Sequence, residues 1–130
     1  MVGLNSQVPA RDAGYQNVQY FRKRIQFSDT VTSTKFRIPA GAIILAPLSG
    51  VDVQTVFNAG TNNRVQIGDA SNASKFGLNV SLTALGFAPM AVAVGHKVTV
   101  ETEVLFALDL SGTAATTGDA EVILAFINPN

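Results

Sequence analysis

Apolar and polar residues alternate with a period of two along most of this 130-residue chain. The alternation is clearest over residues 98–108, where apolar residues are interleaved with Thr99, Glu101 and Glu103. A period of two places the apolar set on one face of a β-strand and the polar set on the other. No segment of eleven or more residues combines a helical period with a cap. We therefore expect an all-β protein, with at most a helical turn near residues 82–87.

The same alternation recurs in several short segments separated by turn residues. Phe21, Ile25 and Phe27 are expected to share one face of a strand with Lys23, and Leu78, Val80 and Leu82 the buried face of another. Further strands are predicted from runs of β-branched and aromatic residues. The predicted strands cover residues 18–27, 34–38, 42–58, 64–68, 78–82, 98–108 and 121–127.

Proline and glycine indicate where these strands are interrupted. Pro47 and Gly50 predict a bulge, a bend or an edge position within residues 42–58, because proline cannot donate a hydrogen bond to a sheet. Residues 86–89 contain Gly and Pro and are expected to turn the chain. The segment 121–127 is apolar on both faces, which predicts a central position in a sheet or burial under another chain.

The number and spacing of the strands predict a single β-sandwich or barrel, with the jelly roll as the leading topology. A chain of this length is sufficient for one core, which we assign to residues 18–130. Residues 1–17 have no regular period and are interrupted by Gly3, Pro9 and Gly14. Such a segment is either a frayed terminus or an extended arm that becomes ordered on a neighbouring subunit.

Charged residues are few and unevenly distributed. They make up 14% of the chain, against about 25% on average. This low share is compatible with a surface covered by neighbouring subunits, or with a surface of uncharged polar residues. The formal net charge is zero, so no general attraction to nucleic acid or anionic lipid is expected. Residues 1–75 carry a balance of +4 and residues 76–130 one of −4, which can complement each other within one sandwich or between copies.

Several classes of functional site are unsupported by the sequence. The absence of cysteine excludes disulfides, thiolate metal ligands and cysteine nucleophiles, and lets the chain fold in a reducing cytoplasm. The single histidine, His96, has no other zinc ligands at a suitable spacing in the sequence. No Gly-x-Ser-x-Gly motif provides a nucleophilic serine that this histidine could activate. No apolar run reaches the ~18 residues of a membrane helix, and no signal peptide is evident. We expect no enzymatic activity, no metal, no cofactor and no membrane association.

Charged residues within strands admit a catalytic or a structural interpretation. Glu101 and Glu103 lie two residues apart on a predicted strand, about 7 Å by strand rise. That separation overlaps the range of glycosidase carboxylates. The pair nevertheless belongs to the polar face of an amphipathic strand, where charge provides solubility. The basic run Arg22-Lys23-Arg24 is similarly interpreted as a solvated strand face, with contact to an acidic partner as the alternative, and not as a nucleic-acid site.

Residues 36–68 combine turns and strands in a distinctive order. The turn Phe36-Arg37-Ile38-Pro39-Ala40-Gly41-Ala42 precedes a strand that ends in Thr55-Val56-Phe57-Asn58-Ala59-Gly60-Thr61, and Ile67-Gly68 lies in the next strand. An acidic strand, a Thr- and Gly-rich hairpin at residues 113–118 and a final strand at residues 121–127 follow. Residues 34–127 thereby resemble small structural proteins of tailed bacteriophages.

Within that class, the resemblance implies a head-decoration or capsid-cement protein on the exterior of the virion, made in the host cytoplasm. Such a protein binds the major capsid protein and copies of itself, with a homotrimer favoured, and does not bind nucleic acid directly. Tail-fibre, baseplate and carbohydrate-binding modules share the same β-rich character and are the alternatives. Partner contacts are expected in the arm and on the exposed side of the first strand, at Val2, Leu4, Val8, Arg11, Tyr15, Arg22 and Arg24.

Overall fold

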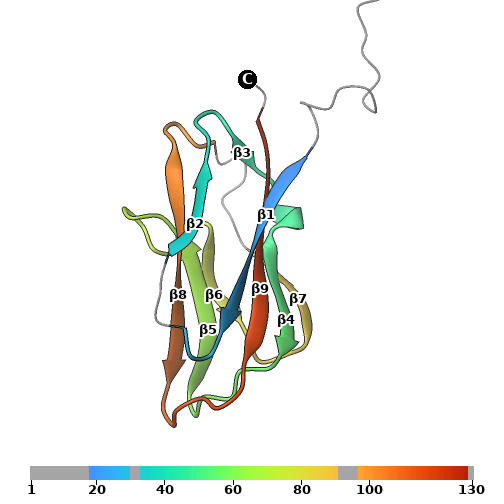
Figure 1. Cartoon of the computed structure of the whole chain (residues 1–130), viewed down its shortest axis with the longest axis vertical. Helices are drawn as coiled ribbons and strands as arrows, with labels where there is room; N and C mark the ends of the chain where they lie inside the picture. The colour runs from blue at the N-terminus through green and yellow to red at the C-terminus, as the bar shows by residue number, and fades with distance from the viewer. Residues whose placement is uncertain (1–17, 30–32, 91–96, 129–130) are drawn as a thin grey trace, which may run out of the picture.

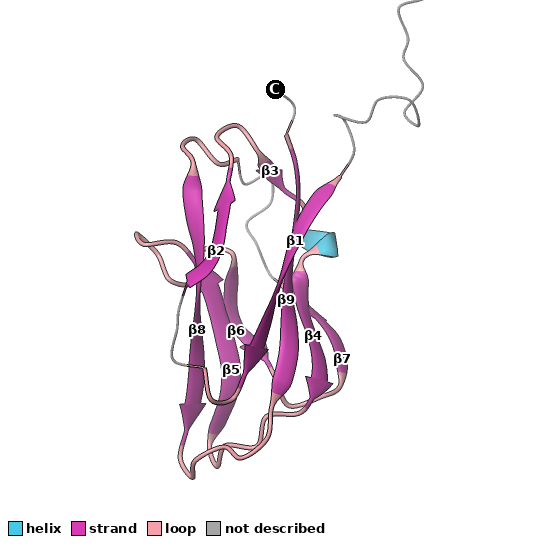
Figure 2. Cartoon of the chain, in the orientation of Figure 1, coloured by secondary structure: helices cyan, strands magenta, loops and turns pink. Residues whose placement is uncertain are grey.

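The computed structural model describes residues 18–29, 33–90 and 97–128, which form nine β-strands and one turn of 3₁₀ helix (Figure 1, Figure 2). The prediction of an all-β protein is therefore confirmed. In chain order the elements are β1 (Gln19–Gln26), β2 (Ser33–Ile38), β3 (Ile43–Ile44), the 3₁₀ turn (Ala46–Leu48), β4 (Gly50–Thr55), β5 (Asn62–Gly68), β6 (Gly77–Ser81), β7 (Gly86–Pro89), β8 (Thr102–Ser111) and β9 (Asp119–Ile127).

The strands form two antiparallel sheets that pack as a β-sandwich (Figure 1). One sheet has the order β1-β9-β4-β7, with β3 also paired to β9, and the other has the order β2-β8-β5-β6. Most consecutive strands lie in different sheets, so the chain crosses between the sheets after β1, β2, β4, β6, β7 and β8. Each sheet consequently contains strands from both halves of the sequence.

The last strand, β9, occupies the interior of its sheet. It pairs with all eight residues of β1 on one side and with β3 and β4 on the other. Val122 and Leu124 are completely buried between the sheets. The central position predicted from its two apolar faces is therefore confirmed, and strands of the same chain cover its edges.

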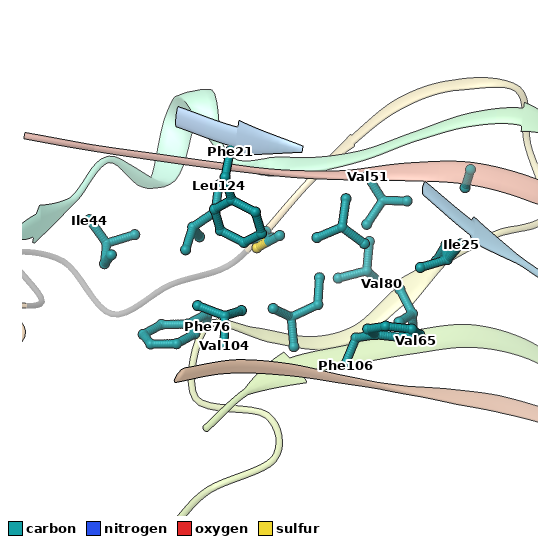
Figure 3. Close-up of a cluster of buried hydrophobic side chains, with 14 of the residues drawn as sticks. Phe21, Ile25, Ile44, Val51, Val65, Phe76, Val80, Val104, Phe106 and Leu124 are labelled. Atoms are coloured by element: carbon teal, nitrogen blue, oxygen red, sulfur yellow. The ribbon is translucent and has the colours of Figure 1, made fainter. Parts of the chain in front are cut away.

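One hydrophobic core fills the space between the sheets (Figure 3). Ile25, Val51 and Leu124 enter it from one sheet, and Val65 and Val104 enter it from the other. All five are fully buried, as the period of two requires. Burial of such side chains is the main source of stability for a sandwich of this kind. The expectation that Phe27 shares the face of Phe21 and Ile25 is wrong: Phe27 is 37% exposed, because β1 ends at Gln26 and the alternation ends with it.

An aromatic cluster closes the side of the sandwich on which β1 and β2 form the sheet edges. The rings of Phe21 and Phe36 stack with their centroids 4.0 Å apart. The ring of Phe126 is tilted against that of Phe36, and the centroids of these two rings lie 6.1 Å apart. Phe21 belongs to β1 and Phe36 to β2, so the stack joins the two sheets directly. Aromatic pairs in this geometry contribute beyond the area they bury.

Pro47 lies in the 3₁₀ turn that separates β3 from β4, which confirms the predicted interruption. Ser49 compensates for the missing backbone pairing at this point. Its buried hydroxyl donates to the carbonyl oxygen of Leu45 at 2.8 Å and accepts from the N–H of Ala125 at 2.9 Å. The chain thus leaves the sheet for one turn without leaving these buried polar groups unsatisfied.

The expected burial of Leu78 is wrong. This side chain is 59% exposed, although Val80 and Leu82 are buried as predicted. β6 contains a bulge relative to β5, in which Leu78 and Asn79 lie opposite the single residue Gln66. Asn79 has a left-handed φ of 51°. The extra residue interrupts the period of two, and Leu78 consequently lies in solvent.

Residues 86–89 form a strand and not the predicted turn. They constitute β7, which pairs with β4 at the edge of its sheet. The chain turns just before it, through bends at residues 83–85, so the expected helical turn at residues 82–87 is also wrong. Pro89 is tolerated because it ends an edge strand, where no neighbouring strand needs its N–H.

Two further boundaries differ from the sequence prediction. β8 begins at Thr102 and not at residue 98, because Val98 donates its N–H to the carbonyl oxygen of Ala42 at 2.8 Å in a separate connection. The predicted hairpin at residues 113–118 instead links β8 in one sheet to β9 in the other. Local patterns identified the strand and the loop, whereas the pairing depends on contacts distant in the sequence.

Candidate partner-binding surface

Ion pairs connect the basic and acidic parts of the sequence within one sandwich. The strongest in geometry joins Arg24 on β1 to Asp119 on β9, with Nε–Oδ1 and Nη2–Oδ2 distances of 3.0 and 2.7 Å. Among the residues that the structure describes, the two parts are also linked by the pairs Arg22–Glu121, Arg37–Glu101 and Arg64–Asp109. The intramolecular interpretation of the charge asymmetry is therefore confirmed, because strands from both halves lie side by side in each sheet.

Arg22 and Arg24, both predicted to contact a partner, have side chains 59% and 66% exposed. The hydrogen bond with Asp119 raises the pKa of Arg24, and the same bond lowers the pKa of Asp119. Exposed ion pairs of this kind contribute little to stability. An acidic partner would have to compete with Glu121 and Asp119 for these guanidinium groups, so their role in binding stays a prediction.

The other predicted contact residues cannot be placed on this surface. Val2, Leu4, Val8, Arg11 and Tyr15 lie outside the described residues, and the single histidine, His96, lies outside them as well.

The two sides of the sandwich have contrasting edge strands. β1 and β2 form one side, and together they contain five cationic residues and no acidic one. β6 and β7 form the opposite side and contain no charged residue. Large apolar side chains are exposed there, at Leu78, Leu85 and Phe87.

Leu85 and Phe87 are candidate contact residues that the sequence analysis missed. A simple signal was present, since no Asp, Glu, Lys or Arg occurs between Lys75 and Lys97. The structure adds that the ring of Phe87 covers Gly50 of the neighbouring strand. A Cβ atom at Gly50 would lie only 2.6 Å from Cζ of Phe87.

A turn at residues 69–75 is organised by the carboxylate of Asp69. Oδ1 accepts hydrogen bonds from the N–H of Ser71 at 3.0 Å, the Ser71 hydroxyl at 2.7 Å and the N–H of Asn72 at 2.9 Å. Oδ2 lies 3.3 Å from Nζ of Lys75. Burial raises the pKa of Asp69, but the hydrogen bonds and the ammonium group outweigh it and lower the pKa below its ordinary value of 3.8.

A hollow of about 250 Å³ lies beside this turn and is lined in part by Glu101 and Glu103. Glu101 precedes β8, is exposed and lies 4.0 Å from Arg37. Glu103 lies within β8 and is partly buried. The third carboxylate at the hollow, Asp69, is already occupied by hydrogen bonds from its own turn. This arrangement supports the structural interpretation of the two glutamates.

The stability of the protein is expected to fall at acid pH as Asp69 becomes protonated. Because its pKa is lower in the folded than in the unfolded state, its contribution is fully present above the unfolded pKa. That contribution is lost as pH decreases through the folded pKa, so little change is expected between pH 7 and pH 5 and a decrease below about pH 4. Urea unfolding at pH 7, 5, 4 and 3 measures this dependence.

The matched variant for this test is Asp69→Asn, which keeps an acceptor oxygen but cannot titrate. It should be less stable than the natural chain at pH 7 and should show a smaller decrease below pH 4. An unchanged acid profile in Asp69→Asn would contradict the assignment, and the titration of other groups such as Asp119 would then be responsible.

In residues 18–29, 33–90 and 97–128, no group of three or more His, Asp or Glu side chains is arranged to hold a metal ion. The same part of the chain contains no helix with the length and apolarity needed to cross a membrane.

The fold is similar to that of a chain in the solved cyanophage Pam1 capsid asymmetric unit. The TM-score is 0.64 and the sequences are 20% identical. The similarity covers 99% of this chain and 98% of that chain. No protein-family model matches the sequence, and no curated protein is similar to it.

Proposed function

We propose that this chain is a non-enzymatic structural protein of a bacteriophage virion, where it binds the exterior of the capsid and stabilises it as a cement or decoration protein. The observation that carries the proposal is the likeness of fold over nearly the full length of both chains to a component of a phage capsid asymmetric unit. The two chains are also of nearly equal length, since each is covered almost completely.

We further propose that the sandwich is a jelly roll. That topology has eight strands in two sheets and occurs in viral capsid domains. Without the two-residue β3, eight strands remain in two four-stranded sheets, β1-β9-β4-β7 and β2-β8-β5-β6. The repeated crossing between sheets supports this assignment over a meander of consecutive hairpins.

The proposed mechanism is stabilisation by selective binding. A protein that binds the assembled shell and not its separated subunits shifts the equilibrium towards the shell. With free protein at 100 times the dissociation constant, each site contributes about 2.7 kcal/mol. The proposed contacts are subunit–subunit contacts, made by a homotrimer or another closed oligomer and by an N-terminal arm at residues 1–17.

Purified protein is expected to co-sediment with phage heads that lack it and to raise the temperature at which these heads release their DNA. Both effects are expected because the protein binds the assembled shell and not its separated subunits. The measurement is fluorescence of a DNA dye during heating, with and without added protein. Heads that already carry a full complement of the protein serve as the control, because they have no free sites.

A glycan array run with the same preparation separates this function from its alternative. Binding of a glycan by the isolated protein, with no affinity for heads, would instead indicate a receptor-binding or carbohydrate-binding module of a tail. Absence of binding to heads at tens of micromolar would contradict the cement function.

A further inference from the structure

We propose that the outer face of the β1-β9-β4-β7 sheet binds an arginine side chain of the capsid subunit to which this chain attaches. In this arginine site, defined as Asp52, Glu121 and Phe87, the two carboxylates pair with the guanidinium group and the ring of Phe87 stacks on it. The inference rests on the proposed function for the identity of the partner, and it specifies the chemistry of one contact.

The three residues of the site form one row across the sheet. Asp52 on β4 lies opposite Glu121 on β9 and, on its other side, opposite Phe87 on β7. The three strands are neighbours in the sheet (Figure 1). Val53 of β4 and Val122 of β9 are buried in the core, so the residues that alternate with them point away from it. The row therefore lies on the outer face of the sheet.

Gly50 allows the ring of Phe87 to lie on this face beside the carboxylates. Gly50 precedes Asp52 by two residues and so belongs to the same face of β4. A Cβ atom at Gly50 would lie 2.6 Å from Cζ and 2.9 Å from Cε1 of Phe87, so the ring extends over the backbone of β4. Phe87 remains 47% exposed. A cation placed over such a ring is attracted by its π electrons.

The carboxylate of Asp52 is not neutralised by any of the residues that the structure describes, among which it has no ion pair. Its neighbour Glu121 carries the same charge. The cations of this face, Arg22 and Arg24, come from β1, which is separated from β4 by β9. Arg24 is bound by Asp119, and β7 contains no charged residue. The row thus has an unmatched negative charge at β4.

Arginine is the side chain that fits a carboxylate pair beside an aromatic ring. Its planar guanidinium group presents a fork of N–H donors that matches carboxylate oxygens, and the same plane stacks on aromatic faces. Its aliphatic stem can cover apolar surface, which Ile123 provides next to Gly50 on this face. The ammonium group of lysine is a compact charge without this planar geometry.

The opposition of Asp52 and Glu121 is a local cost that the fold does not require. Like charges directly opposite each other on neighbouring strands are destabilising. Local conflicts of this kind are expected at functional sites, where a partner compensates for them. Removal of the Asp52 charge should therefore leave the free chain at least as stable, yet weaken binding. That combination distinguishes a contact residue from a structural one.

Co-sedimentation of the full chain with phage heads that lack it tests the inference. Asp52→Asn is expected to weaken binding by about tenfold or more, because the arginine loses a charged partner. The unfolding temperature of this variant should equal or exceed that of the natural chain. Glu101→Gln is the matched control, since it removes a carboxylate that is 61% exposed next to the other sheet and should leave binding unchanged.

Phe87→Leu tests the contribution of the ring. It retains an apolar side chain but removes the aromatic face, and is expected to weaken binding about two- to fivefold. Raising the salt concentration should weaken binding of the natural chain more than binding of Asp52→Asn, because screening acts on the ion pair that the variant lacks.

N-Acetylargininamide tests the site in the absence of heads. At millimolar concentration it is expected to shift the backbone amide NMR signals of β4 and β7 in the natural chain, and to shift them less in Asp52→Asn. N-Acetylcitrullinamide has a similar shape without the charge and should not produce these shifts.

The outcomes distinguish this inference from the proposed function. If heads bind the natural chain and Asp52→Asn equally, the inference is wrong while the proposed function holds. Weaker binding that accompanies a lower unfolding temperature would also contradict it, because Asp52 would then be structural. If heads bind neither chain, the proposed function fails and the probes decide: shifts selective for N-acetylargininamide and for the natural chain support the arginine site, and equal shifts or none overturn it.

Discussion

Replacing Phe76 with alanine is expected to lower the free energy of unfolding by about 3–5 kcal/mol. Phe76 is 1% exposed and belongs to the same core cluster as Val104 (Figure 3). Its removal leaves a cavity between the sheets in addition to the loss of buried apolar area. For a chain of this length, a decrease of this size corresponds to about 10–20 °C in the unfolding temperature. Urea and thermal unfolding measure it directly.

Phe87→Ala is the matched control, because it removes the same ring from a site that is 47% exposed. Its expected cost is about 1 kcal/mol or less, since the ring contacts Gly50 on the surface and fills no cavity. Phe76→Leu preserves part of the volume and should be less destabilising than Phe76→Ala if the latter does not fold. Equal losses for Phe76→Ala and Phe87→Ala would contradict the assignment of the core.

Local periodicity predicted much of this core because the strands retain a regular pleat there. Val65 and Ile67 in β5, and Val104 and Phe106 in β8, are buried as their alternation indicates. The pattern is reliable where each face of a strand keeps the same environment, either core or solvent, along the whole length of the strand. The burial of alternate residues follows directly from the geometry of the extended chain.

The same reasoning failed where the backbone leaves the regular pleat. A left-handed residue at Asn79 reverses the expected side of Leu78, and nothing in the alternation of that segment reveals it. Gly86 and Pro89 indicate a turn by composition, yet pairing with β4 makes this segment an edge strand. Each error arises because a partner strand, distant in the sequence, determines the local conformation.

The candidate interface was less predictable than the core. Arg22 and Arg24 were correctly placed on the exposed side of β1, but their ion pairs with Glu121 and Asp119 depend on the central position of β9. The uncharged segment between Lys75 and Lys97 was visible in the sequence. Its meaning required the strand order, which places β6 and β7 on the same side of the sandwich.

Deletion of residues 1–17 is expected to weaken binding to phage heads by about 10- to 100-fold while leaving the sandwich folded. The deletion preserves β1, which begins at Gln19 and pairs with β9 throughout. Unfolding temperatures of the truncated and full chains should therefore be similar. The expected loss of affinity corresponds to about 1.4–2.8 kcal/mol, as for the removal of one strong interface contact. Co-sedimentation with heads at several protein concentrations measures it.

A pair of point variants tests the proposed arm without shortening the chain. Leu4→Asp introduces a charge at a residue predicted to contact a neighbouring subunit, and Asn5→Asp introduces the same charge at the next residue, which carries no such prediction. Only Leu4→Asp is expected to weaken binding, because it removes an apolar contact and places a carboxylate in its position. Equal effects of the two variants would indicate a general dependence on charge. Full binding by the truncated chain would show that the sandwich alone supplies the contacts, with Arg22 and Arg24 as the remaining predicted residues.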